Sequence, residues 1–537
     1  MSVAPSAHDV IVVGGGVTGA GVARDLALRG VSVLLLEKGD WGGGTSGGSS
    51  WMIHGGPRYL EFDWETTRLS AQDAGHIVRI ARHLVHRIAF LIPVLPGDRN
   101  NLERMETAME VYDRFQPLKL SNTHVRLTRE EALAIEPGLT PNLVGAVTME
   151  EWGVDPHRLA WANVLDAVEH GARALNHARV SSLLRDQRSV IGVRYVRDGA
   201  EVEARARVVV NAAGPWVPEL AAMAGQEVRL RPAKGIHIVF DRRISNFALS
   251  GEAIDGRDLL VVPHGPITVV GTTDDDFYGD LDSVDVLPDE VDYLLQGVER
   301  IFPAIREYRA VRATTGVRPT LHRWRLYEDD LSRRYEVIEH PAAPGLVSIA
   351  GGKLSMYRLM AEETADAVCR HLGLGSQNEC STWNIPLPGA EAERPSAAEL
   401  AAEFGTTELA AARLLKRHGS RASAVLKEDT RHGRITCRCD PLLEAELVYA
   451  VRHEQVSGLA DAFRRVSLAA GPCAGTACVQ RAAEVVGREL GWSPAQRLEA
   501  AEDYWRGSWL GRAAVIDSRG WAQEELRRAA APRVGAR

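Results

Sequence analysis

A short β-branched run followed by a cluster of glycines constrains the fold of this 537-residue chain more than any other feature. Residues 10–13 read VIVV, and Gly14, Gly15, Gly16 and Gly19 follow, so that a G-x-G-x-x-G pattern opens a predicted helix. The first glycine of this pattern allows a tight turn, the second lets the backbone approach a pyrophosphate, and the third lets the helix pack on the strand. We therefore predict a Rossmann-like unit with the positive end of its helix facing phosphate groups.

A carboxylate stands where a dinucleotide-binding unit needs one. The next apolar run, residues 31–37 (VSVLLLE), ends at Glu37, which lies 21 residues after Gly16. An acid at this position usually binds a ribose hydroxyl of the nucleotide. A glycine-rich turn without a ligand is the alternative interpretation, but the strand, the helix and the acid together favour a nucleotide site.

Composition limits the classes of protein to which the chain can belong. It has 45% hydrophobic and 25% charged residues, as in an ordinary globular protein, and is long enough for two or three domains. Its net charge of −8 argues against nucleic acid as a partner. The apolar runs fall short of the about 18 residues that span a bilayer, and six cysteines do not make a disulfide scaffold. Because the N-terminal residues do not resemble a secretory signal, we expect a cytoplasmic protein and leave peripheral contact with the cytoplasmic membrane face open.

Two later segments are expected to return to the same nucleotide site. Residues 206–216 (ARVVVNAAGPW) read as a buried strand that ends in a turn at Gly214, and residues 345–368 read as a strand, Gly351 and Gly352, and a helix. In open α/β sheets, ligands bind at the carboxyl ends of the strands. A dinucleotide that is contacted from both ends of the chain is typical of FAD rather than NAD, so we predict tight, non-covalent FAD.

Seven motifs occur in an order that is similar to one known family. They are DVIVVGGGVTGAG (9–21), GTSGGSSWMIHGGPRYL (44–60), VVVNAAGPW (208–216), KGIHIVF (234–240), GTTDDDF (271–277), TTGVRPTL (314–321) and GGKLSMYR (351–358). Together they resemble FAD-dependent glycerol-3-phosphate dehydrogenase, a member of the D-amino-acid-oxidase-like superfamily, over about residues 8–375. The resemblance implies oxidation of sn-glycerol 3-phosphate to dihydroxyacetone phosphate, with electrons passing from the flavin to a quinone or a protein acceptor.

The resemblance also implies an α/β fold in which a Rossmann-like FAD-binding domain carries an inserted antiparallel-sheet substrate domain and is followed by an all-α C-terminal domain. The expected FAD-binding domain comprises residues 1–95, 150–225 and 345–375, and the expected substrate-binding domain comprises residues 96–149 and 226–344. Residues 376–396, rich in Pro, Gly and Ser, are expected to be a linker, and residues 397–537 the helical domain.

The hydroxyl-rich motif, residues 44–60, is expected from the resemblance to wrap the FAD pyrophosphate and to run beneath the flavin. The hydroxyls that can bond phosphate and ribityl groups are those of Thr45, Ser46, Ser49 and Ser50. By the resemblance, His54 would lie near the isoalloxazine and Arg58 would face the substrate. Trp51 stands where the family usually has a basic residue and Pro57 where it usually has leucine, which bears on substrate specificity.

Cations in glycine-flanked turns are expected to bind the phosphate of the substrate. The four candidates are Arg58, Arg318, Arg333 and Lys353, and a shift from Arg333 to the adjacent Arg334 is the alternative at one position. Arginine forks bind phosphate bidentately and lysine adds a point charge. Each of these residues taken alone could instead be a solvated surface charge, and only the resemblance makes them a site.

The general base is less determined than the phosphate site. Alternation in residues 231–240 puts His237 on the face opposite Ile236 and Ile238. His237 is one candidate base, and His54 or no histidine at all are the alternatives. Asp274 follows a strand and is expected to form a turn or to support a neighbouring residue.

Two cysteine pairs in the helical region point to a metal centre. Cys437 and Cys439 precede one predicted helix, and Cys473 and Cys478 open another, with 33 residues between the pairs. The pattern resembles the bacterioferritin-associated-ferredoxin-like [2Fe–2S] domain, in which four thiolates hold two irons. Structural zinc takes the same ligands and is the second interpretation. Four buried small residues without a metal are the third.

Two other functions stay open at this stage. One is a related flavoenzyme that acts on a 2-hydroxy acid or an amine. The other is an electron-transfer subunit that binds FAD and a cluster but no small substrate. The sequence identifies neither the electron acceptor nor the oligomeric state, and a homo-oligomer is one of the alternatives.

Overall fold

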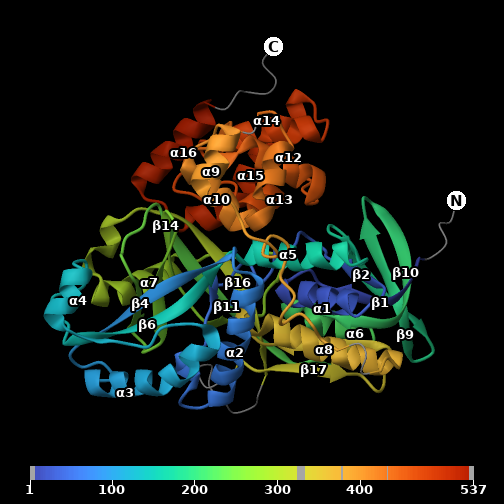
Figure 1. Ribbon diagram of the computed structural model, residues 1–537, viewed down its shortest axis with the longest axis horizontal. Coiled ribbons are helices and arrows are strands. Elements are labelled where there is room, and N and C mark those ends of the chain that lie inside the picture. Colours follow the sequence, from blue (N-terminus) through green and yellow to red (C-terminus); the bar gives the residue numbers. More distant parts are fainter. Residues whose placement is uncertain (1–5, 323–332, 376–378, 432, 531–537) are drawn as a thin grey trace.

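In the part of the chain that the structure describes, most strands belong to two large sheets, and a helical domain lies over the boundary between them (Figure 1). The structure is a computed structural model that describes residues 6–322, 333–375, 379–431 and 433–530. The expected architecture of a Rossmann-like domain, a second sheet and a helical C-terminal domain is confirmed by this arrangement.

The first sheet has a parallel core. Within the described residues it contains eight strands, and its central order is β17-β18-β10-β1-β2-β7. The bounds are β1 (Ser6–Val13), β2 (Val33–Leu36), β7 (Arg173–Leu175), β8 (Arg179–Asp186), β9 (Ser189–Arg197), β10 (Ala200–Asn211), β17 (Tyr335–Glu339) and β18 (Leu346–Gly351). Strand β1 pairs in parallel with β2 and β10, and β10 pairs in parallel with β18. Because both faces of these strands are buried, residues 10–13 of β1 and the whole of β2 are continuous apolar runs rather than alternating ones.

Helices cover one face of this sheet, where α1 packs against α5 and α8. The helices attached to this part are α1 (Val17–Leu28), α2 (Trp64–Ile80), α5 (Pro156–Glu169), α6 (Val217–Ala222) and α8 (Tyr357–Leu372). The start of α5 is fixed by Asp155, whose side chain accepts hydrogen bonds from two backbone N–H groups of the first turn. Strand β18 pairs with β10, and α8 packs on α1. Gly351 and Gly352, at the junction of β18 and α8, therefore return to the same sheet as the N-terminal strand and helix, as the sequence predicts.

The second sheet is largely antiparallel and lies beside the first. Its central order is β15-β11-β14-β13-β12-β4-β6-β3, with β16 on β11 and β5 on β6. The bounds are β3 (Met52–Ile53), β4 (Val85–Val94), β5 (Arg126–Thr128), β6 (Gly145–Val154), β11 (Leu230–Phe240), β12 (Ala248–Glu252), β13 (Asp258–His264), β14 (Ile267–Gly271), β15 (Asp275–Asp276) and β16 (Ala310–Leu321). Its outer helices are α3 (Leu102–Tyr112), α4 (Arg129–Ile135) and α7 (Pro288–Ile301).

The strand pairing differs from two domain borders predicted from the sequence. From the sequence, residues 85–95 and those from 150 onward were expected in the first domain, but β4 and β6 pair with each other along their whole length in the second sheet. The apolar content of β4 and β6 does not reveal which sheet buries them, so the expected border fell inside a strand pair.

The helical domain contains one small sheet, so it is largely helical rather than all-α. Strands β19 (Ile435–Cys437) and β20 (Leu442–Leu443) form a short antiparallel pair beside the cysteines. The helices are α9 (Ala397–Phe404), α10 (Glu408–His418), α11 (Ala422–Lys427), α12 (Glu444–His453), α13 (Leu459–Val466), α14 (Val479–Glu489), α15 (Pro494–Ala513) and α16 (Ser518–Ala530).

The segment that leads into the helical domain is packed rather than loose. Leu387 is fully buried, and its N–H donates to the carbonyl of Ile80 at 2.8 Å. Arg24 of α1 donates to the carbonyl of Ile385 at 2.7 Å. The expected linker is thus anchored on the first domain. Among the helices in the described part of the chain, none combines the length and the apolar character that crossing a membrane requires.

Candidate active site

A cavity of about 720 Å³ lies between the two sheets. The first sheet contributes the glycine turn after β1, the end of β2 and the end of β18 to its walls, and the second sheet contributes β11, β14 and β16. The first strands of the chain and the much later strand β18 therefore meet at one cavity, as expected for a dinucleotide that is contacted by the first and last strands of the sheet.

The glycine turn has the geometry that phosphate binding requires. Gly14 has φ +114°, a region that side-chain-bearing residues rarely adopt, and a Cβ on Gly19 would collide with the carbonyl oxygen of Gly14. The N–H groups of Gly15 and Gly39 donate to Glu37 at 2.6 and 2.7 Å. Burial raises the pKa of Glu37 and these two backbone bonds oppose the rise. The acid thus lies beside the turn and lines the cavity.

The hydroxyl-rich motif lines the cavity and is fixed to α1 of the first domain and to β16 of the second sheet. Ser46 Oγ accepts a hydrogen bond at 2.9 Å from the N–H of Val17, at the N-terminus of α1. Thr45 Oγ1 donates to the carbonyl of Val317 on β16 at 2.5 Å. Ser49 and Ser50 also line the cavity. Four of the predicted cofactor ligands therefore lie along one wall, and their contact with FAD stays a prediction.

Arg318 and Arg333 share one carboxylate at the substrate end of the cavity. Arg318 Nη1 and Arg333 Nη2 each lie 3.1 Å from Asp274, on its two different oxygens. Burial disfavours the charged form of Asp274, but the two guanidinium groups outweigh it and hold the pKa of this acid below its usual value. Of the two adjacent candidates, Arg333 lines the cavity, whereas Arg334 pairs with Asp63 at 2.7 Å. Asp274 is thus a supporting residue rather than a turn former alone.

Lys353 and Arg58 flank the ring of Tyr59 at the same end. The Lys353 Nζ lies 5.0 Å and the Arg58 Cζ 5.3 Å from the ring centroid. Lys353 also donates to the carbonyl of Gly55 at 3.4 Å. Burial, together with the nearby cations, lowers the pKa of Lys353 to about 7. Its ammonium therefore titrates near neutral pH, unlike that of a surface lysine.

Both candidate histidines line the cavity in their neutral form. Burial, with a further effect of Arg318, lowers the pKa of His237 to about 3, and its Nε2 lies 2.8 Å from Ser50 Oγ. Burial and the positive charge of Lys353 hold the pKa of His54 well below its usual value. Each ring can therefore accept a proton at neutral pH, although neither is a strong base.

A buried group of three residues beside Gly55, the neighbour of His54, has no counterpart among the residues expected from the sequence. Lys119 Nζ lies 2.6 Å from Glu151 Oε2, and Tyr112 donates to the other oxygen of Glu151. Glu151 lines the cavity and accepts from the N–H of Gly55 at 3.3 Å. The three residues come from separate elements and form no local motif. The sequence clue is the pair of acids Glu150 and Glu151 in a strand, GAVTMEEWGV, whose other residues are mostly apolar.

The two residues that depart from the family pattern have defined places. Trp51 has φ +57°, its Nε1 donates to the carbonyl of Gly47 at 3.1 Å, and its ring lies 5.3 Å from that of His264. It packs on a buried cluster that includes Ala474, next to Cys473. Pro57 occupies the first position of a 3₁₀ turn, where its missing N–H costs nothing. Trp51 is therefore partly buried and packs toward the cysteine region.

The four cysteines of the helical domain come together. The Cys478 thiol shares hydrogen bonds with Cys437 and Cys473, and Cys473 also bonds Cys439. The bond from Cys478, helped by backbone N–H groups, lowers the pKa of Cys473 to about 5. As placed, the thiols bond to one another. Within the described part of the chain, no group of three or more histidine, cysteine, aspartate or glutamate side chains is arranged to hold a metal ion. Cys369 lies within α8 and Cys380 in the segment that follows it; their thiols contact Arg29 and Asp25 of the first domain and take no part in this group.

A glycine turn and a second sheet that face one cavity define an FAD-dependent oxidoreductase. Residues 9–367 match the family of that description, and residues 380–497 match the C-terminal domain of alpha-glycerophosphate oxidase. The chain is 35% identical over 515 residues to one subunit of the anaerobic glycerol-3-phosphate dehydrogenase of Escherichia coli, covering 94% of this chain and 92% of that one. It is 32% identical to a subunit of the anaerobic glycerol-3-phosphate dehydrogenase from Haloferax volcanii, over 89% and 83% of the two chains. The chain belongs to the glycerol-3-phosphate dehydrogenase family of FAD-dependent oxidoreductases.

A solved structure agrees with this family. The glycerol-3-phosphate dehydrogenase from Bacillus halodurans, solved as a complex with FAD, superposes with a TM-score of 0.75 at 26% identity and covers 95% of this chain and 96% of that one. The predicted family and the use of FAD are thus confirmed. The span that contains the four cysteines matches the oxidase C-terminal domain, and its resemblance to a ferredoxin-like domain stays a prediction.

Proposed function

We propose that this protein oxidises sn-glycerol 3-phosphate to dihydroxyacetone phosphate with FAD. The observation that carries the proposal is the group of four cations, Arg58, Arg318, Arg333 and Lys353, at one end of a cavity whose other end has the dinucleotide turn. A phosphate monoester carries nearly two negative charges, and paired guanidinium groups with an ammonium are suited to bind it. The names of the relatives, which are glycerol-3-phosphate dehydrogenases, support the same substrate.

Different cavity residues then have different roles in the oxidation at carbon 2 of glycerol 3-phosphate. The FAD supplies the acceptor for the hydride. His54 and His237, both neutral, are the two groups that can accept the hydroxyl proton. The nearby cations stabilise the alkoxide character that develops on the oxygen as the proton leaves. Asp274 holds Arg318 and Arg333 in place, so that both forks face the phosphate before it arrives.

Steady-state assays with an artificial electron acceptor separate this proposal from its alternatives. Glycerol 3-phosphate is expected to be the preferred substrate, and 2-hydroxyglutarate and amino acids are expected to give little turnover because they cannot occupy a site for a dianionic phosphate. A preference for either competitor would move the protein to a different substrate class. Turnover of none of them, in protein that contains FAD, would favour an electron-transfer subunit.

The titration of Lys353 predicts a pH dependence. Its pKa of about 7 lies well below the usual value for lysine, so its ammonium is present below pH about 7 and is lost as the pH rises through that value. If the ammonium binds the phosphate, kcat/KM for glycerol 3-phosphate falls on the alkaline side with an apparent pKa near 7. The variant Lys353→Arg keeps its charge, so this alkaline limb should disappear from its profile. The same limb in both proteins would assign the ionisation to another group.

We further propose that Cys437, Cys439, Cys473 and Cys478 hold a [2Fe–2S] centre that takes electrons from the flavin. One observation supports it: hydrogen bonds link the four thiols in a series, Cys437 to Cys478, Cys478 to Cys473 and Cys473 to Cys439. Four neighbouring thiolates are the ligand set of a [2Fe–2S] core, and the side chains would have to turn from one another toward the irons to bind it. The cysteine loop also packs on the second sheet beside Trp51, one residue from the cavity-lining Ser50. Such a centre would supply a one-electron route from the flavin to a quinone or a protein acceptor.

Iron and sulfide analysis after anaerobic purification tests this centre. About two irons and two sulfides per chain are expected, together with a visible absorption beyond that of the flavin. Cys473→Ser is expected to lose both metal and absorption, whereas Cys369→Ser, in α8, is expected to keep them. Zinc without iron, or no metal in the native protein and in Cys369→Ser, would contradict the proposed [2Fe–2S] centre. The proposed flavin chemistry would be unaffected. Peripheral membrane contact and self-association stay predictions from the sequence.

A further inference from the structure

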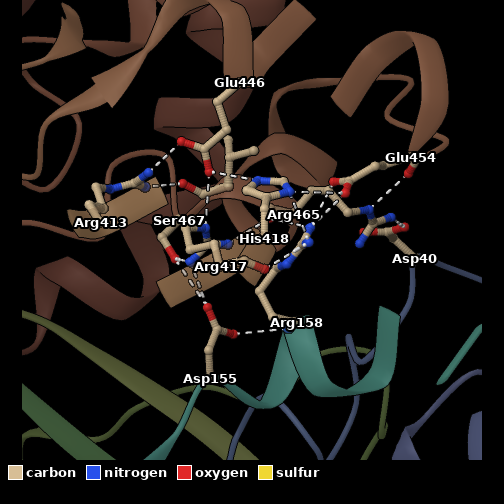
Figure 2. Close-up of polar contacts among 11 residues, drawn as sticks. Asp40, Asp155, Arg158, Arg413, Arg417, His418, Glu446, Glu454, Arg465 and Ser467 are labelled. Atoms are coloured by element: carbon tan, nitrogen blue, oxygen red, sulfur yellow. Dashed lines mark hydrogen bonds and ion pairs between the residues drawn. The ribbon is translucent and has the colours of Figure 1, made fainter. Parts of the chain in front are cut away.

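The helical domain contacts the first domain through buried charges rather than through an apolar surface alone. Figure 2 shows Asp155 and Arg158 rising from α5, and Asp40 from the loop after β2, toward arginine, histidine and glutamate side chains of the helical domain. Arg158 donates to both oxygens of Glu454 at 2.9 and 2.8 Å. Arg417 donates to Asp155 at 2.7 Å. Pairs of this kind have strict geometry, because each partner would otherwise be left charged and buried.

One part of this interface holds the loop that carries the cofactor acid. Asp40 lies three residues after Glu37 and is buried. Its two oxygens accept from neighbouring residues of α13, Arg465 Nη2 at 2.6 Å and Arg464 Nε at 2.9 Å. The next residue, Trp41, is fully buried and donates to Gln455 at 3.2 Å, between α12 and α13. The corner between these two helices therefore fixes residues 40 and 41 of the cofactor loop.

Arg464 differs from the other arginines of this interface because it reaches the cavity. It lines the cavity together with Asp40, Gly43 and Thr45, and it is the one cavity residue among those described that the helical domain supplies. Its Nε is used by Asp40, and its Nη2 donates to Asp461 at 3.2 Å. Its Nη1 has no hydrogen-bond partner in the described part of the chain. A guanidinium so placed has donors left for an anion in the cavity.

We propose that Arg464 is an FAD ligand supplied by the helical domain, and that it binds the anionic pyrophosphate region of the cofactor. Its neighbours in the cavity wall are the residues between Glu37 and Ser46, which lie beside the glycine turn. Planar guanidinium groups bind phosphate oxygens through charge-assisted hydrogen bonds. The assignment depends on FAD binding and not on which substrate is oxidised.

One consequence is a thermodynamic link between the cofactor and the helical domain. A ligand that contacts two domains binds only when they are docked, so its binding stabilises the docked state by the same free energy. FAD is therefore expected to reduce hydrogen exchange in α12 and α13, although the helical domain carries none of the G-x-G-x-x-G motif. In the other direction, a loosened interface is expected to weaken FAD binding.

The test measures FAD affinity in the full-length protein. Apoprotein is prepared by dialysis against a chaotropic salt, and FAD binding is followed by the quenching of flavin fluorescence. Arg464→Ala is expected to raise the Kd for FAD about ten-fold or more, the usual size of a lost charge-assisted bond. Arg464→Gln keeps a polar side chain with an N–H donor but removes the positive charge and the reach of the guanidinium, and it serves the same purpose if the alanine variant fails to fold. In both variants, FAD should no longer slow hydrogen exchange in α13 as it does in the native protein.

Two controls separate a direct contact from a general loosening. Arg452→Ala removes an arginine of α12 that pairs with Glu428 and Glu489 inside the helical domain, and its Kd should equal that of the native protein. Asn176→Ala removes a different hydrogen bond to Asp40, at 3.1 Å, without removing a charge from the cavity, and should change the Kd less than about three-fold. A native Kd in Arg464→Ala, or an equal loss in Asn176→Ala, would overturn the assignment.

Discussion

Replacing Arg318 by alanine is expected to lower kcat/KM for glycerol 3-phosphate at least about thirty-fold. A charge-assisted bond to phosphate is worth on the order of 2–3 kcal/mol, which corresponds to this factor. The variant has a second defect, because Asp274 keeps its negative charge but loses one of its two guanidinium partners. The carboxylate, then paired with Arg333 alone, would repel the phosphate dianion that enters beside it more strongly.

Flavin content and a double variant make this expectation specific. FAD should remain bound in Arg318→Ala, since Arg318 contacts Asp274 and Thr272 rather than the glycine turn. Arg318→Ala combined with Asp274→Asn should recover part of the loss, because it removes the negative charge that has lost one of its two arginine partners. Arg306→Ala serves as the matched control, because Arg306 pairs with Asp292 and Glu299 on the surface. An unchanged kcat/KM in Arg318→Ala would remove this arginine from the substrate site.

Replacing Glu446 by alanine is expected to destabilise the helical domain by about 3–5 kcal/mol. Glu446 is fully buried and bonds Arg413 at 2.5 Å, Arg417 at 3.1 Å and His418 at 3.3 Å (Figure 2). Its removal would leave two guanidinium groups short of a buried partner. Because Arg417 also pairs with Asp155, the loss would spread to the interface with the first domain.

Denaturant unfolding followed by circular dichroism measures this effect. Glu484→Ala is the matched control, because Glu484 is exposed and pairs only with Arg497 among the described contacts, so its midpoint should be close to native. Burial alone would raise the pKa of Glu446, but Arg413 and its neighbours hold it at about 2. Since the unfolded value is near 4.3, the stabilisation is complete above that pH and is lost as the pH falls toward 2. A native midpoint in Glu446→Ala would contradict this account.

The features that the sequence predicts well are local in the chain. The glycine turn, Glu37 and the hydroxyl-rich motif each lie within a few tens of residues of β1, and the physical requirement of each residue is visible in its own neighbourhood. The return of Gly351 and Gly352 could be predicted because the chemistry of a dinucleotide demands it. The four cations could be placed at one site only through the resemblance to a family.

The features that could not be predicted from the sequence depend on distant partners. Arg158 and Glu454 are 296 residues apart, and no pattern around either residue indicates the other. Lys119, Tyr112 and Glu151 likewise come together only in the folded protein, beside Gly55, and no local pattern links them. The border at β4 was misplaced for a related reason, because an apolar strand can be buried by either sheet.

Anaerobic mixing of the purified protein with glycerol 3-phosphate tests the proposed activity most directly. The substrate is expected to remove the visible absorbance of the oxidised flavin and to leave at least one dihydroxyacetone phosphate per FAD, without any added electron acceptor, since the flavin takes the two electrons of one turnover and a [2Fe–2S] centre would take a further one. Amino acids and 2-hydroxyglutarate are expected to leave the flavin oxidised over the same period. Flavin that stays oxidised with glycerol 3-phosphate, or that is bleached by one of the competitors instead, would contradict the proposed function.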